Sequence, residues 1–345
     1  MGIRTFRNDR GRRWPRLILT GLVLGAAAAV GAGLWLITPP PPYTPLTGVD
    51  KSRVALFALG DQGSGDMQQW RVALGMEHAA ERNGGVGMVV LLGDNFYGPA
   101  LKGTADHAWE LKFERVYWGS WLSHVPFYAV LGNHDYPSSS EVELAYSREA
   151  RGSGRWQMPG RVYSRDFGDA GGRPVLRVVF LDTSQGREGI LEQAAFIREA
   201  FAAGPVPIWR VVAAHHPLRN RGKHGDDEEL LGDLLPVLEQ SGVDLYLAGH
   251  DHNQQLILRP GEPAWVISGG GGQNIYPLGE VNREDTPFAL SRPGFTGLEF
   301  TPGQLRLAYY DENGGAERRF SWGRGCAWGA QGCLLAEPQG KLAGN

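Results

Sequence analysis

The sequence predicts an α/β fold in which two mixed β-sheets pack face to face, with helices on both outer sides. Three observations support this prediction. In the first half of the chain, apolar strand-like runs alternate with helix-like segments, which is typical of parallel βαβ units. In the second half, strand-like runs follow one another without helices between them. Several apolar runs also end in a polar residue, and open α/β sheets bind ligands beyond the carboxyl ends of their strands.

Composition limits the classes of function. The chain is 42% hydrophobic and 21% charged, as expected for a globular protein with a sizeable core. Its net charge of −3 argues against a nucleic-acid binder, which would usually have a basic face. The two cysteines, Cys326 and Cys333, are not spaced as in a structural zinc ribbon. In an oxidising compartment we expect them to form a disulfide bond.

The N-terminal region suggests export or membrane attachment. Residues 1–16 are strongly basic, and the uncharged stretch 17–37 is long enough to cross a bilayer as a helix. The basic flank should stay cytoplasmic, which places the rest of the chain outside, in the periplasm or at the cell surface. One interpretation is a cleaved export signal, for which Arg12-Arg13 suggests the twin-arginine type. The other is an uncleaved transmembrane anchor, which we favour because the apolar run continues past its small residues.

The remaining chain divides into three parts. Residues 38–50 are proline-rich and predict a stiff, extended linker, 51–322 form the folded domain, and 323–345 form a C-terminal tail. Hydrophobic patterning and turn residues locate the elements of the domain. We expect helices at 67–82, 105–117, 140–148, 191–201 and 226–240, and strands at 53–59, 87–92, 125–131, 162–167, 175–181, 208–214, 243–248, 255–258, 264–268, 297–300, 305–310 and 316–322.

Polar residues that follow the predicted strands form a candidate metal-binding set. They combine hard oxygen donors with imidazoles and include no thiolate, which suits iron, zinc or manganese rather than copper(I). A single aspartate at such a position would more simply cap the next helix, so the argument depends on the whole set. The set is too large for one tetrahedral ion and suits two ions that share a carboxylate. Its members are Asp61, Asp94, Tyr97, Asn133, His215, His250 and His252.

Five short motifs carry a resemblance to a known family. They are Gly60-Asp61-Gln62-Gly63, Gly93-Asp94-Asn95-Phe96-Tyr97, Gly132-Asn133-His134-Asp135, Val212-Ala213-Ala214-His215 and Gly249-His250-Asp251-His252. Together, in this order and each at a predicted strand end, they resemble the signatures of the purple acid phosphatases of the calcineurin-like metallophosphoesterase superfamily. The resemblance runs from about Val54 to about Trp322 and is greatest to the small, mammalian-type enzymes. It implies a dimetal acid phosphatase that hydrolyses phosphate monoesters by attack of a metal-bound hydroxide.

The resemblance also assigns roles to the metal-binding set. It implies one ferric ion, one divalent ion that is iron, zinc or manganese, and a bridging carboxylate. The ferric ligands would be Asp61, Tyr97 and His252, the bridge Asp94, and the ligands of the divalent ion Asn133, His215 and His250.

Four further residues are assigned to catalysis or substrate binding. By resemblance, His134 faces the substrate phosphate or the leaving group, with Asp135 orienting it. His224 resembles a second substrate-pocket histidine, although a solvated position in its glycine-flanked loop is the alternative. His216 stands where the animal enzymes carry tyrosine, and either lines the pocket or supports the turn into Pro217. Protonated imidazoles at mildly acidic pH would attract phosphate and donate a proton to the leaving oxygen.

Two other functions compete with this one. The first is a phosphodiesterase or nucleotide hydrolase of the wider superfamily, against which Tyr97 argues because most of those relatives lack the tyrosine. The second is a non-catalytic surface protein on the same scaffold, which should have lost some of the seven ligands. We expect a monomer that acts on a phosphate monoester, contacts the membrane through its N-terminal segment and binds no nucleic acid.

Overall fold

The computed structural model describes residues 18–25, 40–136, 139–326 and 333–336. The chain divides into two compact units, Met1–Pro41 and Pro42–Asn345. Residues 18–25 of the first unit are helical. In the described part of the chain, no helix combines the length and the apolar character needed to cross a membrane. The basic region 1–16 and most of the predicted membrane segment 17–37 lie outside the described residues.

The described residues of the second unit contain an eight-stranded mixed sheet. Strands β1 to β4 are parallel, and β12 pairs antiparallel with β1, followed by the antiparallel strands β13 to β15. The spatial order is β15-β14-β13-β12-β1-β2-β3-β4. The bounds are β1 (Val54–Leu59), β2 (Met88–Leu92), β3 (Phe127–Val130), β4 (Trp156–Gln157), β12 (Gly294–Phe300), β13 (Gln304–Asp311), β14 (Ala316–Gly323) and β15 (Leu334–Ala336).

A second, seven-stranded sheet has the order β11-β9-β10-β8-β7-β6-β5 within the described residues. Its centre, β6-β7-β8-β10, is parallel, and β5, β9 and β11 pair antiparallel with their neighbours. The bounds are β5 (Tyr163–Phe167), β6 (Leu176–Phe180), β7 (Trp209–Ala213), β8 (Leu245–Ala248), β9 (Gln254–Ile257), β10 (Ala264–Ser268) and β11 (Phe288–Leu290).

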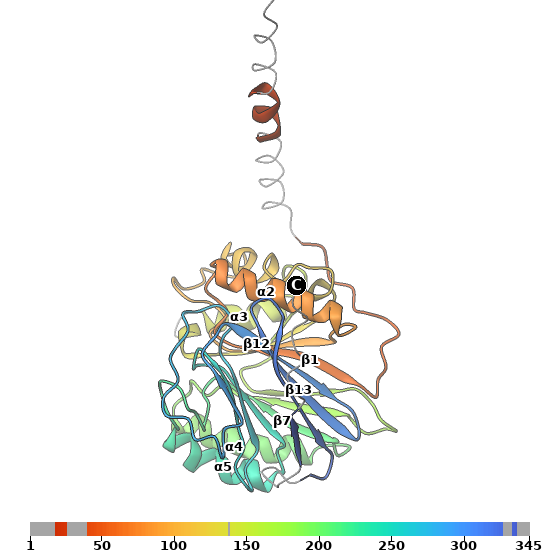
Figure 1. Ribbon diagram of the computed structural model, residues 1–345, viewed down its shortest axis with the longest axis vertical. Coiled ribbons are helices and arrows are strands. Elements are labelled where there is room, and N and C mark those ends of the chain that lie inside the picture. Colours follow the sequence, from red (N-terminus) through yellow and green to blue (C-terminus); the bar gives the residue numbers. More distant parts are fainter. Residues whose placement is uncertain (1–17, 26–39, 137–138, 327–332, 337–345) are drawn as a thin grey trace, which may run out of the picture. The chain divides into compact units, whose positions relative to one another are not determined.

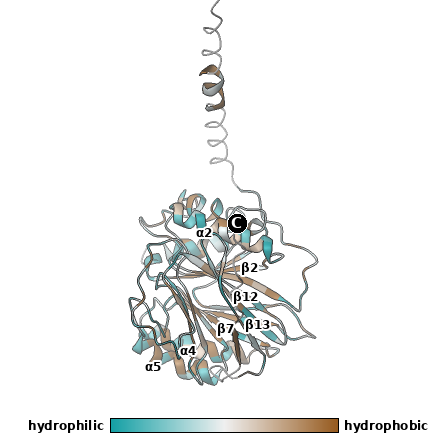
Figure 2. Ribbon diagram, viewed as in Figure 1, coloured by the Kyte–Doolittle hydropathy of each residue, from teal (hydrophilic) through white to brown (hydrophobic). Residues whose placement is uncertain are grey.

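The helices cover the outer sides of the two sheets (Figure 1). Helices α2 (Met67–Arg82) and α3 (Ser140–Arg148) lie with the first sheet, and α4 (Arg187–Ala202) and α5 (Glu228–Gln240) with the second. Figure 2 shows the strands between them as largely hydrophobic, and every residue of β2, β8 and β10 is buried. Strands that are covered on both faces have continuous apolar sequences. The predicted fold class is therefore confirmed.

One predicted helix is confirmed only in part. Within the segment 105–117 the helical residues are 108–114, and Glu110–Glu114 are π-helical. The backbone carbonyls of Glu114 and Tyr117 accept hydrogen bonds from the guanidinium of Arg155, which is fully buried. A tertiary contact thus replaces the regular helical pattern at this point.

The expected disulfide is confirmed. Cys326 and Cys333 are joined near the C-terminal end of the described chain. Between β14 and β15, this bond closes a short loop whose residues 327–332 lie outside the described part.

Candidate active site

The candidate ligands lie where strands of both sheets end. In the first sheet, β1, β2 and β3 are adjacent and parallel, and their carboxyl ends lead into the loops with Asp61, Asp94 and Asn133. In the second sheet, the neighbouring parallel strands β7 and β8 lead into the loops with His215 and His250. Parallel strands end at the same edge of their sheet. Residues far apart in the sequence therefore meet at one place.

Asp61, Tyr97 and His252 form the first group of donors. The hydroxyl of Tyr97 lies 3.1 Å from Oδ1 of Asp61 and 3.3 Å from Nε2 of His252. The same Nε2 is 3.4 Å from Oδ1 of Asp61. Tyr97 also donates to Oδ2 of Asp94 at 2.8 Å. The structure thus brings together the three residues expected to bind the ferric ion, on the Oδ2 side of Asp94.

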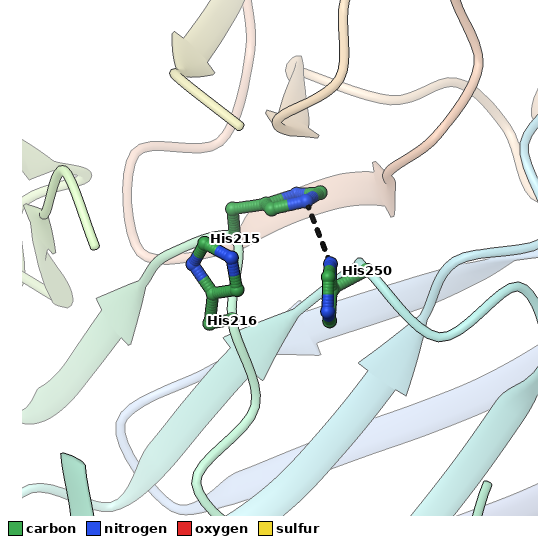
Figure 3. A group of neighbouring side chains, drawn as sticks. All are labelled: His215, His216 and His250. Carbon is green, nitrogen blue, oxygen red and sulfur yellow. Dashed lines mark hydrogen bonds between the residues drawn. The ribbon is translucent and has the colours of Figure 1, made fainter. Parts of the chain in front are cut away.

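Asn133, His215 and His250 form the second group. Oδ1 of Asn133 lies 3.0 Å from Nε2 of His215 and 3.1 Å from Nδ1 of His250. The two imidazole nitrogens are 3.2 Å apart (Figure 3). Oδ1 of Asp94 is 3.5 Å from Nε2 of His215. The two carboxylate oxygens of Asp94 therefore face different groups, as a bridging ligand requires.

The hydrogen bonds of two histidines show that this donor set suits cations. Nδ1 of His215 donates to the carbonyl of Leu92 at 2.8 Å, and Nδ1 of His252 donates to the carbonyl of Asn274 at 2.6 Å. In a neutral imidazole, the other nitrogen, Nε2, then carries a lone pair. These lone pairs face carbonyl and carboxylate oxygens. Burial lowers the pKa of each ring, but Asp94 beside His215 and Asp61 beside His252 outweigh it and raise both pKa values, so this position favours a positive charge, whether a proton or a metal ion. A backbone carbonyl that fixes the tautomer in this way is common for histidines that bind metals.

The electrostatics of the groups agree with a cation site. Burial raises the pKa of Asp61 and of the Tyr97 hydroxyl, and the charge of Asp94 raises both further. Their anionic forms are therefore costly without a positive charge nearby, and a bound cation reverses this effect. Burial and the neighbouring His215 lower the pKa of His250, which keeps its imidazole neutral, as a ligand must be.

Three of the ligand candidates have a left-handed backbone. The φ angles of Asp61, Asp94 and His250 are 61°, 55° and 66°. Such conformations cost on the order of 1–3 kcal/mol each and are concentrated at functional sites. The strand ends are also packed closely, since a Cβ atom at Gly132 would lie 2.3 Å from Oδ1 of Asp94. Only glycine allows the β3 loop to approach the bridging candidate so closely.

Asp135 has partners other than those expected. Its Oδ1 accepts from the backbone N–H groups of Asn95 and Phe96 at 2.9 and 3.1 Å, and its Oδ2 from that of Gly132 at 2.8 Å. In the short helical turn Asn133–Asp135, His134 is exposed and Asp135 is buried, so the two side chains lie in different surroundings. The ring of His134 instead lies 4.6 Å from that of Tyr97. Asp135 thus holds the loop that carries Asp94 and Tyr97, and the expectation that it orients His134 is corrected accordingly.

Sequence reasoning missed a buried amide that links three loops. The side chain of Asn95 donates to the carbonyl of Val130 at 2.8 Å and to Oε2 of Glu143 at 3.0 Å. Its Oδ1 accepts from Gln62 at 2.9 Å. Burial raises the pKa of Glu143, which favours its neutral form. Asn95 was visible within its motif, but nothing in the sequence marked Glu143 except an acidic residue on a short helix.

The remaining histidines border the second group. The His224 ring lies 4.3 Å from that of His250, and its Nδ1 is 3.3 Å from Oδ2 of Asp251. The His216 ring lies 4.5 Å from that of His250, and its Nδ1 is 2.9 Å from the hydroxyl of Thr183. Burial and the neighbouring His215 lower the pKa of His216 to about 3, so its imidazole stays neutral. Figure 3 shows one ring nitrogen of His216 on the side of His250.

Comparison with known proteins supports the family resemblance. Residues 60–254 match the family model described as calcineurin-like phosphoesterase. Purple acid phosphatase 4 of Arabidopsis thaliana is 30% identical over 76% of this chain and 81% of its own length. Tartrate-resistant acid phosphatase type 5 of Mus musculus is 28% identical over 74% of this chain and 86% of its own length.

The fold also has solved counterparts. The structure of GAP50, described as the anchor in the inner membrane complex of Plasmodium, superposes with a TM-score of 0.67 at 22% identity. The match covers 76% of this chain and 86% of that chain. At this identity the likeness shows the fold alone. The sequence matches go further: the chain is a metal-dependent phosphoester hydrolase of the calcineurin-like class, and it belongs to the purple acid phosphatases.

Proposed function

We propose that the protein is a dimetal acid phosphatase that hydrolyses phosphate monoesters outside the cytoplasmic membrane. The observation that carries the proposal is the position of Asp94. Its two carboxylate oxygens serve two groups of donors, with Tyr97 on one side and His215 on the other. Two ions that share one carboxylate match the two-metal sites of phosphatases.

The two groups would hold different ions. The phenolate and carboxylate donors of the first suit a ferric ion, and the imidazole and amide donors of the second suit divalent iron, zinc or manganese. When bound, such ions activate water and offset the negative charge that develops on the phosphoryl oxygens. The ferric set is Asp61, Tyr97 and His252, the divalent set is Asn133, His215 and His250, and Asp94 belongs to both.

Histidines at the rim would bind the substrate and donate the proton. The backbone N–H of His134 donates to Oδ1 of Asp94 at 2.8 Å, which fixes its exposed ring beside the site. Oδ2 of Asp251 lies 3.3 Å from Nδ1 of His224, which leaves Nε2 of that ring free to donate a proton to the leaving oxygen. His216 stays neutral and would contact the phosphate as a hydrogen-bonding group. Imidazoles that carry a proton at mildly acidic pH would attract phosphate, so we expect the reaction to be faster in acid.

Two features support a location outside the cytoplasm. The disulfide between Cys326 and Cys333 suits an oxidising compartment. The basic region 1–16, followed by the uncharged stretch 17–37, has the order of an export signal or an anchor. An impermeant phosphomonoester offered to intact spheroplasts tests the location. Hydrolysis should match that of lysed cells, and activity that appears only after lysis contradicts the proposal.

The catalytic proposal is tested with the metal-loaded full chain. p-Nitrophenyl phosphate should be turned over faster at pH 5 than at pH 8, and faster than its diester bis(p-nitrophenyl) phosphate at either pH. His224→Ala should lower kcat by about 10²-fold, the smaller end of the effect of a general acid. His78→Ala, an exposed histidine on α2, is the matched control and should leave kcat unchanged. A preference for the diester would favour the phosphodiesterase alternative.

A further inference from the structure

An exposed lysine lies beside residues of the candidate active site. Lys223 immediately precedes His224, and its ammonium lies 4.3 Å from the centroid of the Tyr276 ring. In the part of the chain that the structure describes, no carboxylate lies within 4.0 Å of this ammonium. Lys223 therefore offers a positive charge that no acidic side chain neutralises.

The loop that carries Lys223 is fixed to the metal-ligand motif. The backbone N–H groups of Lys223 and His224 donate to the two carboxylate oxygens of Asp251 at 3.0 and 3.3 Å. Asp251 is fully buried and stands between His250 and His252 in the sequence. A Cβ atom at Gly222 would lie 2.6 Å from Oδ1 of Asp251, so glycine permits this approach. The backbone of Lys223 is thus placed relative to the metal ligands.

Tyr276 fixes the other end of the lysine. Its backbone N–H donates to the carbonyl of His252 at 3.0 Å, and its ring stacks on the His252 imidazole with centroids 4.0 Å apart and planes 14° apart. The Tyr276 ring in turn attracts the ammonium of Lys223 through a cation–π contact. The Tyr276 ring therefore lies between the ammonium of Lys223 and the candidate metal ligand His252.

We propose that Lys223, held by Tyr276, binds a second anionic group on the leaving side of the substrate. The inference rests on the proposed function, in which the leaving oxygen departs beside His224, next to Lys223. If the leaving group is itself a phosphate, its negative charge would lie close to the Lys223 ammonium and be attracted by it. In that reaction water adds across the P–O–P bond, and the second phosphate leaves with a proton from His224. The favoured substrates are therefore phosphoanhydrides, such as pyrophosphate, relative to monoesters of uncharged alcohols.

The test compares two substrates on the metal-loaded full chain. The measured quantity is kcat/KM for pyrophosphate divided by kcat/KM for p-nitrophenyl phosphate. Lys223→Gln should lower this ratio about tenfold, the lower end of what a hydrogen bond to a charged group contributes. Lys223→Arg keeps the charge and should keep the ratio within about threefold of the wild type. Lys51→Gln removes an exposed lysine just before β1, at the end of that strand opposite Asp61, and should leave the ratio unchanged.

A binding measurement separates this inference from the catalytic proposal. Calorimetry with methylenediphosphonate and with methylphosphonate needs no turnover. Lys223→Gln should weaken binding of the diphosphonate about tenfold more than binding of the monophosphonate. An equal loss for both ligands and both substrates would show that Lys223 only supports the loop, and no loss for either would show that it has no part in binding. Either result overturns the inference, whether or not the wild type hydrolyses phosphate esters.

Discussion

Replacing Asp94 by asparagine tests the bridge between the two groups of donors. The change keeps the shape of the side chain and removes one negative charge that both sites share. Oδ2 lies 2.8 Å from the Tyr97 hydroxyl and Oδ1 3.5 Å from Nε2 of His215, so each bound ion would be a close neighbour of the lost charge. Two unit charges 4 Å apart interact by about 4 kcal/mol at an effective dielectric constant of 20, and the ions carry more than one charge. Each ion should therefore bind at least about 10³-fold more weakly.

The assay is the metal content after dialysis against buffers of defined free iron and zinc, read by elemental analysis. Wild-type protein should retain two ions per chain, and Asp94→Asn should lose both over the same range. Asp182→Asn is the matched control, because Asp182 is also a fully buried aspartate that follows a strand, β6, and it contacts Tyr136 and Ser184. It should retain both ions.

The chelated protein provides a check on folding. Asp94 raises the pKa of the buried Asp61, which means that the two carboxylates repel each other when no ion is bound. Without metal, Asp94→Asn should therefore unfold at the same temperature as the wild type or higher, although it is less stable than the wild type in the presence of metal. If the variant keeps two ions at wild-type affinity, or loses only one of them, Asp94 is not the bridge.

Two further predictions concern colour and stability. Tyr97→Phe should abolish the visible absorption of the iron-loaded protein, because the charge-transfer band requires a tyrosinate ligand; a variant that stays coloured would contradict the assignment. Arg155→Met should lower the free energy of unfolding by about 3–5 kcal/mol, measured by urea denaturation. Arg155 and Glu114 form an ion pair 3.0 Å apart in which both side chains are fully buried, and the substitution leaves the charge of Glu114 buried without its partner. The exposed pair of Arg151 with Glu149 is the control, and Arg151→Met should cost less than about 1 kcal/mol.

The sequence predicted those parts of the fold that depend on local pattern. The boundaries of α2 and α3 match the expected ranges 67–82 and 140–148 because their burial follows the helical period, and those of β10 match 264–268 because it is a short, continuous apolar run. The expected helix at 105–117 forms only over 108–114, and at its end the fully buried Arg155, distant in the sequence, binds the carbonyls of Glu114 and Tyr117. The period of a segment contains no information about such a distant donor.

In the candidate site, too, the features that depend on local sequence pattern could be predicted, and those that depend on distant contacts could not. The ligand candidates could be predicted because each lies in the loop that follows an apolar run, and the topology then brings those loops together. The groups that hold them could not be predicted in this way. The carbonyl of Asn274 orients His252, and Asp135 anchors the loop of Asp94, through contacts that no motif records. Lys223 and Tyr276 meet only because their loops are folded back onto the same motif.

The carbonyl groups that orient the histidines have a consequence for how the protein matures. Leu92 holds His215, Asn274 holds His252 and Asp135 holds the Asp94 loop through hydrogen bonds that involve no ion. We therefore expect folding and metallation to be separate events, unlike in small zinc domains that are unfolded without their metal. The polypeptide would acquire its shape first and its ions afterwards. Since divalent metals are selected in cells partly by their supply, the compartment in which the finished protein resides would then decide which divalent ion enters the second group of donors.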